Sequence, residues 1–306
     1  MIRILNTPTA PLACFALVAA IVFPVVASAQ APQNTAQAAK ATSTSFDPHD
    51  LSGVWYRTSN IQTFSNVYNV QPDLPPNLAG ERGRGTVFAE APFTAAGKAA
   101  LEKNKPGYGP RVVPPAFGND PMGTCDPLGI PRSLNAEVGS SHTTWEIVQT
   151  KDRMFQFFQW HHDHRVVWAD GRALPKTDDL DPLPNGYSVG HWNGNIFVVD
   201  SIGFDARTWL DKFGYAHTEA MKLQERYRRT GPETLELTMT LTDPEYYSRP
   251  WESDVKTFKL NGSPIREFPV GEPFVKNWDE QVYCWPSIEG KFNEKVRDAG
   301  AGKGHP

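Results

Sequence analysis

A strict alternation of apolar and polar residues between positions 235 and 242 narrows the folds open to this chain more than any other feature. Leu235, Leu237, Met239 and Leu241 alternate with one glutamate and three threonines. A repeat of two is the spacing of a β-strand that buries one face and exposes the other. Such a strand needs neighbours that bury the same face, so the segment predicts an antiparallel sheet packed on a core.

Turn signals place further strands around this one. Asn193-Gly194 favours a tight hairpin, because a type I′ turn needs positive φ at both central residues. Three hairpins are predicted, joining 142–150 to 153–169, 188–192 to 196–204, and 220–229 to 234–242. More strands are expected at 51–56 and 255–260, and helices only at 95–103, where Thr94 is the predicted N-cap, and at 288–297. About seven or more short strands with little helix predict a mostly β domain, an antiparallel lipocalin-like barrel or, alternatively, a β-sandwich.

The N-terminal segment 1–29 has the composition of a secretory signal peptide. One charge, Arg3, precedes an apolar run over 12–26, and the small triplet Ala27-Ser28-Ala29 forms an A-x-A cleavage site. The run is shorter than the roughly 20 residues of a membrane-spanning helix. We therefore expect a periplasmic or secreted protein with no membrane span once the signal is removed.

The remaining chain is expected to form a linker and one domain. Residues 30–46 are small and polar and predict a flexible linker. A single β-barrel domain is expected over 47–306. It carries an arm rich in proline and glycine at 71–132, which forms either a lid over a site or a packing arm.

Composition and cysteine content exclude several functions. The formal net charge of −4 offers no basic patch for nucleic acid, and the chain has no Rossmann, Walker or C-x-x-C motif, so nucleotide cofactors are not expected. Two cysteines follow the signal, Cys125 and Cys284. In an oxidising compartment an even pair predicts a disulfide, the alternative being two unrelated buried thiols.

Candidate chemistry concentrates in the segment 154–172, MFQFFQWHHDHRVVWADGR. As one strand over 153–169, it would put Trp160, His162, His164 and Trp168 on one face and Arg165 on the other. In a barrel one of these faces lines the interior, so a polar constellation in an aromatic interior pocket is expected.

A second group of candidates comes from later segments. Glu225 shares a face with apolar neighbours and Tyr227, so its carboxylate must be ion-paired, for example with Arg165 or Arg172, or act as an acid or base with a raised pKa. The charged and aromatic loop 203–219 is expected to form the rim of a site.

The hypothesis that follows is acid–base chemistry by His162 and His217, oriented or tuned by Asp211 and Glu225. The predicted substrate-binding residues are Trp160, His164, Arg165, Trp168, Arg172, Trp209 and Tyr227.

Two other chemistries are weighed against this one. No metal cofactor is predicted, but His162-x-His164 together with His142, His191 or His217 is the alternative, a site for a divalent metal such as zinc. Residues 186–190 match the G-x-S-x-G pattern of serine hydrolases. A nucleophile elbow needs a strand before the serine and a helix after it. A hairpin signal follows instead, so Ser188 is read as structural.

Several motifs resemble a large family of uncharacterised exported bacterial proteins. They lie at 125–132, 146–150, 162–172, 188–211, 216–229 and 243–251, and the resemblance covers about 109–260. It implies export but no particular reaction. In addition, Gly53-x-Trp55 is similar to the Gly-x-Trp near the first strand of lipocalins.

The expected function is action on a small apolar or aromatic organic molecule by histidine and carboxylate acid–base chemistry, as a lyase, isomerase or hydrolase. The first alternative is a non-catalytic periplasmic protein that binds a small hydrophobic ligand. A second is a metalloenzyme with histidine ligands, and a third is a structural envelope protein.

Overall fold

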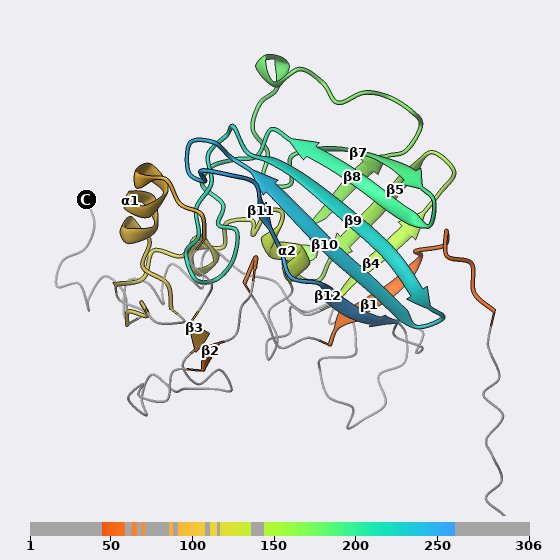
Figure 1. Ribbon diagram of the computed structural model, residues 1–306, viewed down its shortest axis with the longest axis horizontal. Coiled ribbons are helices and arrows are strands. Elements are labelled where there is room, and N and C mark those ends of the chain that lie inside the picture. Colours follow the sequence, from red (N-terminus) through yellow and green to blue (C-terminus); the bar gives the residue numbers. More distant parts are fainter. Residues whose placement is uncertain are drawn as a thin grey trace, which may run out of the picture. The chain divides into compact units, whose positions relative to one another are not determined.

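The computed structural model describes residues 45–58, 63–65, 69–70, 86–87, 91–107, 111–114, 117–135 and 144–260, all within the unit Thr44–Pro306 (Figure 1). The strands are β1 (Gly53–Arg57), β2 (Asn69–Val70), β3 (Thr86–Val87), β4 (Thr144–Gln149), β5 (Arg153–Phe158), β6 (His164–Trp168), β7 (Tyr187–Asn193), β8 (Ile196–Ile202), β9 (Lys222–Gly231), β10 (Thr234–Thr242), β11 (Trp251–Glu252) and β12 (Lys256–Leu260). The helices are α1 (Ala95–Lys103), α2 (Arg132–Asn135) and the short 3₁₀ turns η2 (Pro121–Thr124), η3 (Trp160–His162) and η4 (Thr177–Asp179).

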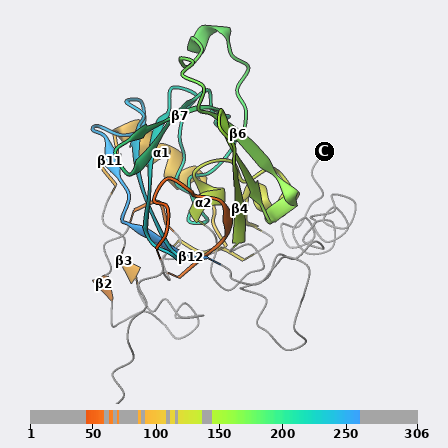
Figure 2. The ribbon, with the colours of Figure 1, turned by 90° about the vertical axis from the view of Figure 1, so that its right-hand side faces the viewer.

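Nine strands close a barrel in the order β10-β12-β1-β4-β5-β6-β7-β8-β9, with β9 returning to pair with β10. The predicted class, a mostly β lipocalin-like barrel, is confirmed. All neighbours along this ring are antiparallel except β6 and β7, which run parallel. Parallel neighbours cannot be joined by a tight turn. The connection 169–186 therefore crosses over, and both views show it projecting away from the strands (Figures 1 and 2).

The three predicted hairpins are present as β4–β5, β7–β8 and β9–β10. The type I′ turn expected at Asn193-Gly194 is wrong by one residue. Asn193 pairs with Ile196, so the turn is centred on Gly194 and Asn195, and only Gly194 has a positive φ, of 57°, which is the pattern of a type II′ turn. Helix α1 occupies the expected residues, and the Thr94 hydroxyl accepts a hydrogen bond from the Gly97 amide at 3.0 Å, which confirms the N-cap. The helix predicted at 288–297 lies outside the described residues.

The prediction of one strand over 153–169 is wrong. The chain turns back at η3, so β5 and β6 form an antiparallel hairpin, closed by a 2.7 Å bond from the Phe158 amide to the Asp163 carbonyl. His162 takes a positive φ of 52° in this turn, although no glycine, asparagine or proline marks it. The inward face consequently changes from even-numbered residues in β5 to odd-numbered residues in β6, where Arg165 and Val167 are buried.

The barrel interior is packed with aromatic and aliphatic side chains. The four apolar residues of β10 are buried, as their alternation predicted. Among the large aromatic side chains with almost no exposure are Trp55, Trp145, Phe158, Tyr227 and Phe258. These rings fill much of the space in which the sequence predicted a ligand pocket.

The described part of the arm packs against the barrel. Phe93 forms a bridge with Tyr247 and stacks on Tyr215. Helix α2 is buried throughout and lies within the outline of the strands in both views (Figures 1 and 2). These contacts favour the packing alternative for the arm, of which only β3 is described between 71 and 90.

Candidate functional site

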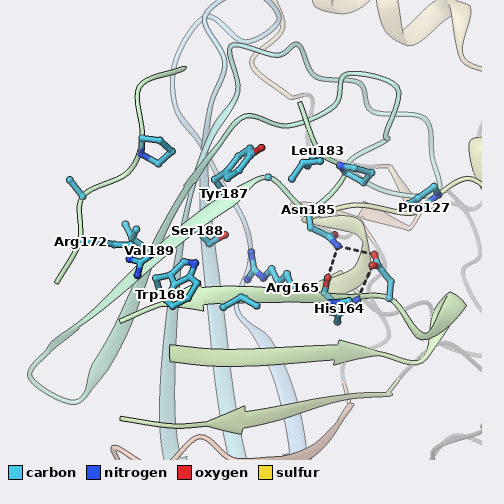
Figure 3. Close-up of a pocket in the computed structure, with 16 residues that line it drawn as sticks. Pro127, His164, Arg165, Trp168, Arg172, Leu183, Asn185, Tyr187, Ser188 and Val189 are labelled. Atoms are coloured by element: carbon cyan, nitrogen blue, oxygen red, sulfur yellow. Dashed lines mark hydrogen bonds between the residues drawn. The ribbon is translucent and has the colours of Figure 1, made fainter. Parts of the chain in front are cut away.

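A pocket of about 700 Å³ lies on the outer face of the barrel, between the β6–β7 pair and the crossover 169–186 (Figure 3). Four residues of β6 outline one side of it: His164, Arg165, Val166 and Trp168. The crossover and the start of β7 supply most of the rest, including Arg172, Leu183, Asn185, Tyr187 and Val189. This pocket lies outside the sheet, whereas the sequence predicted one in the barrel interior.

The pocket exists because β6 and β7 separate after a short pairing. They pair at only two positions, Val167 with Ser188 and Trp168 with Val189. Before β7 the chain is attached elsewhere, since the Leu183 amide donates to the Gly203 carbonyl at 2.9 Å. Gly186 makes this path possible: its φ is 61°, and a Cβ there would lie 2.7 Å from the Ile202 carbonyl oxygen.

One end of the pocket is polar and is built from Asp163, His164 and Asn185 (Figure 3). The Asn185 amide nitrogen donates to the Asp163 carboxylate at 2.8 Å and to the His164 carbonyl at 3.2 Å. The other carboxylate oxygen of Asp163 accepts the His164 amide at 2.8 Å. The Asn185 carbonyl oxygen is buried, and no described residue donates to it.

The other end is lined by Trp168 and Arg172, and Arg153, which does not line the pocket, also contacts the Trp168 ring. The guanidinium carbons of Arg172 and Arg153 lie 3.7 and 4.4 Å from the centre of the Trp168 ring. Arg172 is also ion-paired with Asp170 at 2.6 Å. These cation–π contacts hold the start of the crossover against β6.

A buried ion pair lies beneath the pocket, on the inner side of β6. Arg165 donates to both carboxylate oxygens of Glu225, and its Nε donates to the Gln156 side chain at 2.6 Å. The Tyr227 hydroxyl donates to Glu225 at 2.5 Å. Burial, together with the Glu225 charge, raises the pKa of Tyr227 well above its ordinary value. The structure thus pairs Glu225 with Arg165, one of the two partners considered from the sequence.

The loop 203–219 places its predicted residues in the packed end of the barrel. Asp211 is fully buried and accepts the amides of Phe64 and Phe213, yet burial raises the pKa of its carboxyl to about 6. His217 is 1% exposed. Its ring nitrogens lie within hydrogen-bond distance of protein groups, Nδ1 at 3.0 Å from the Thr218 carbonyl and Nε2 at 2.8 Å from the Thr208 hydroxyl. Burial lowers the His217 pKa, which favours the neutral imidazole.

The predicted site residues therefore fall into separate places. The pocket brings together four of the predicted substrate-binding residues, His164, Arg165, Trp168 and Arg172. Tyr227 lies in the network beneath it, Trp160 lies in η3, and Trp209 is buried with Arg132 5.9 Å from its ring. The pocket lining includes none of the catalytic candidates His162, His217, Asp211 and Glu225, whose catalytic role stays a prediction.

Sequence reasoning missed Asp163, Asn185, Leu183 and Tyr187 as pocket residues. The last three belong to the segment DPLPNGY at 181–187, which leads into β7 and held none of the predicted site residues. Its run of proline, asparagine and glycine was the available signal, because loops with such residues commonly carry binding sites.

The structure also bears on the alternative chemistries. Among the residues that it describes, no three His, Cys, Asp or Glu side chains are placed to hold a metal ion, and His142 lies outside that set. Ser188 sits inside strand β7, with its hydroxyl 2.8 Å from that of Ser201, so no helix follows it as a nucleophile elbow requires. Cys284 lies outside the described part of the chain, and the disulfide with Cys125 stays a prediction.

Comparison of the chain with protein-family models, with curated proteins and with solved structures finds no match. Across the described residues, every helix is too short or too polar to cross a bilayer.

Proposed function

We propose that this protein is an exported binding protein for a small organic molecule with an apolar or aromatic body, which lies in the pocket on the outer face of β6 and β7. The observation that carries the proposal is the pocket itself. Its volume of about 700 Å³ falls in the usual range for ligand sites, and Val166, Trp168, Leu183 and Tyr187 give it apolar walls beside a few polar groups.

Binding is preferred to acid–base catalysis because of where the acid–base candidates lie. Asp211, His217 and Glu225 are each at most 1% exposed. Their polar atoms already bond to protein groups: Asp211 accepts from backbone amides, His217 bonds to threonines, and Glu225 accepts from Arg165. A substrate held in the pocket would meet His164 and Asp163 instead.

Export is part of the proposal and rests on the sequence. The signal peptide at 1–29 and the predicted pair of Cys125 with Cys284 both suit an oxidising compartment outside the cytoplasm. Purification of the processed chain from a periplasmic fraction, with N-terminal sequencing beginning at Gln30, tests this part directly.

Filling the pocket with a larger side chain tests the binding function. Saturable fluorescence of the neutral probe N-phenyl-1-naphthylamine is expected with the natural chain, and Val166→Trp should weaken its affinity by about tenfold or more, since an added indole occupies the site. Val148→Trp is the matched control, because Val148 is an exposed valine on the outer face of β4 and does not line the pocket. An equal loss of dye affinity in both variants, or no saturable dye binding to the natural chain, would overturn the proposal.

A further inference from the structure

The charges that line the pocket do not cancel. Arg165 is neutralised by Glu225 beneath the sheet, and Arg172 is paired with Asp170. Asp163 is the remaining charged residue of the lining, and no cation of the described chain lies within ion-pair distance of it. The pocket therefore presents one uncompensated carboxylate to whatever enters it.

A second acceptor lies beside this carboxylate. The Asn185 amide cannot turn over, because its oxygen would then face the Asp163 carboxylate and the His164 carbonyl, both of which only accept hydrogen bonds. The amide orientation is fixed, and the Asn185 carbonyl oxygen is left without a donor. At this end of the pocket the Asp163 carboxylate thus has two amide donors but no counter-charge, and the neighbouring Asn185 carbonyl oxygen has no donor.

From this geometry we infer that the ligand is an amine: a small molecule with an ammonium group that donates to Asp163, and an apolar or aromatic body that extends toward Trp168. This inference rests on the proposed binding function. An ammonium supplies both a positive charge and up to three donors, which matches what this end lacks. A neutral alcohol matches the donors but not the charge, and a carboxylate is repelled by Asp163.

Three probes of similar shape separate these cases: 2-phenylethylamine as the cation, 2-phenylethanol as the neutral molecule and 3-phenylpropanoate as the anion. Each is used to displace N-phenyl-1-naphthylamine from the full processed chain at neutral pH. The amine should displace the dye at a concentration lower than the alcohol by about tenfold or more, as expected for a charge-assisted hydrogen bond, and the anion should be the weakest.

Variants assign the preference to its residues. Asp163→Asn should bring the amine and the alcohol to within about threefold of each other while dye binding persists. Asp178→Asn is the matched control, since Asp178 is an exposed carboxylate of the same crossover in η4 and does not line the pocket. Asn185→Leu keeps the carboxylate, so the preference for the amine over the alcohol should persist in this variant.

The outcomes distinguish this inference from the binding function on which it rests. If the dye binds in the pocket but the natural chain prefers the alcohol or the anion, the amine class is wrong and the binding function stands. If Asp163→Asn retains the full preference for the amine, the carboxylate does not select it and the inference fails. Absence of dye binding to the natural chain would remove both proposals.

Discussion

At the scale of single residues, the pair of Arg165 and Glu225 is the most costly feature of the barrel interior. Both side chains are removed from water, among rings and leucines, and they connect β6 to β9. Gln156 extends the network to β5. Desolvation of two charges is offset only when each keeps its partner and its hydrogen bonds. The pair therefore acts as one unit, and loss of one member costs more than loss of both.

Arg165→Met is expected to lower the free energy of unfolding by about 3–5 kcal/mol, because the Glu225 carboxylate would stay buried without a cation. The double variant Arg165→Met/Glu225→Gln removes that stranded charge and should recover a large part of the loss. Equilibrium unfolding in urea measures both.

The matched control for this measurement is Arg172→Met, since Arg172 is half-exposed and its pair with Asp170 should be worth about 1 kcal/mol or less. Two results would show that the network does not stabilise the barrel in this way. One is a double variant no more stable than Arg165→Met, and the other is an Arg165→Met variant that loses no more stability than Arg172→Met.

The sequence predicted one residue-scale feature well and another poorly. Glu225 had to be buried because it shares a strand face with Leu223 and Tyr227, and a buried carboxylate needs a partner such as Arg165. Asp163 and Asn185 gave no comparable signal. They meet only because the chain turns back at η3 and the crossover returns beside it. That contact joins two loops, and no local periodicity reports it.

At the scale of elements, local turn chemistry predicted the hairpins, and long-range pairing decided the rest. Asn193-Gly194 located the β7–β8 turn to within one residue, because Gly194 is its first central residue, and the alternation of β10 specified a strand with one buried face. The turn at η3 has no such marker, since His162 takes positive φ without being glycine or asparagine. The parallel step from β6 to β7, which creates the pocket, likewise depends on pairing across 18 intervening residues (Figure 2).

The β7–β8 turn offers a clean test of backbone strain. Gly194→Ala should destabilise the protein by about 1–2 kcal/mol, because its φ of 57° is unfavourable for a residue with a Cβ. An added methyl group there meets no atom within 4 Å, so packing does not contribute.

Gly107→Ala is the control for this prediction. Its added Cβ is equally free of contacts, but its φ is not in the positive region, and its stability should stay within about 0.5 kcal/mol of the natural chain. Thermal and urea unfolding compare the two variants. Equal losses of stability in the two variants would show that Gly194 is not needed for the positive φ of the turn.

At the scale of the whole molecule, strand number and amphipathic patterning were enough to predict a barrel, but not how its end is closed. The loop 203–219 was expected to form the rim of a site, yet it buries Leu210, Asp211 and His217 against the core. Lys256 is buried at the start of β12, where its ammonium donates to the Thr63 carbonyl and to Asp254, both at 2.6 Å. Burial opposes the charged form of each of these ionisable groups, so the closed end makes stability depend on pH.

Lys256 gives the clearest of these dependences. Burial lowers its pKa to about 8, and the charge of Arg57 acts in the same direction. In the unfolded chain a lysine titrates near 10.4, so the unfolded state binds this proton more tightly than the folded state. The destabilisation caused by burying the Lys256 charge is complete below about pH 8. It disappears as the pH rises through the lysine pKa of the unfolded chain. Stability from this group should therefore increase by about 1.5 kcal/mol between about pH 8 and pH 9.5.

Urea unfolding across this range checks the prediction, with the natural chain compared against Lys256→Met, which should lack the increase. Lys259→Met is the matched control, because Lys259 is an exposed lysine of the same strand and its removal should leave the increase in place. The range stops below pH 10 because burial raises the pKa values of Tyr227 and Tyr247 well above the ordinary tyrosine value, which makes stability fall at higher pH. Identical pH dependence in the natural chain and Lys256→Met would show that the ammonium does not oppose closure of this end of the barrel.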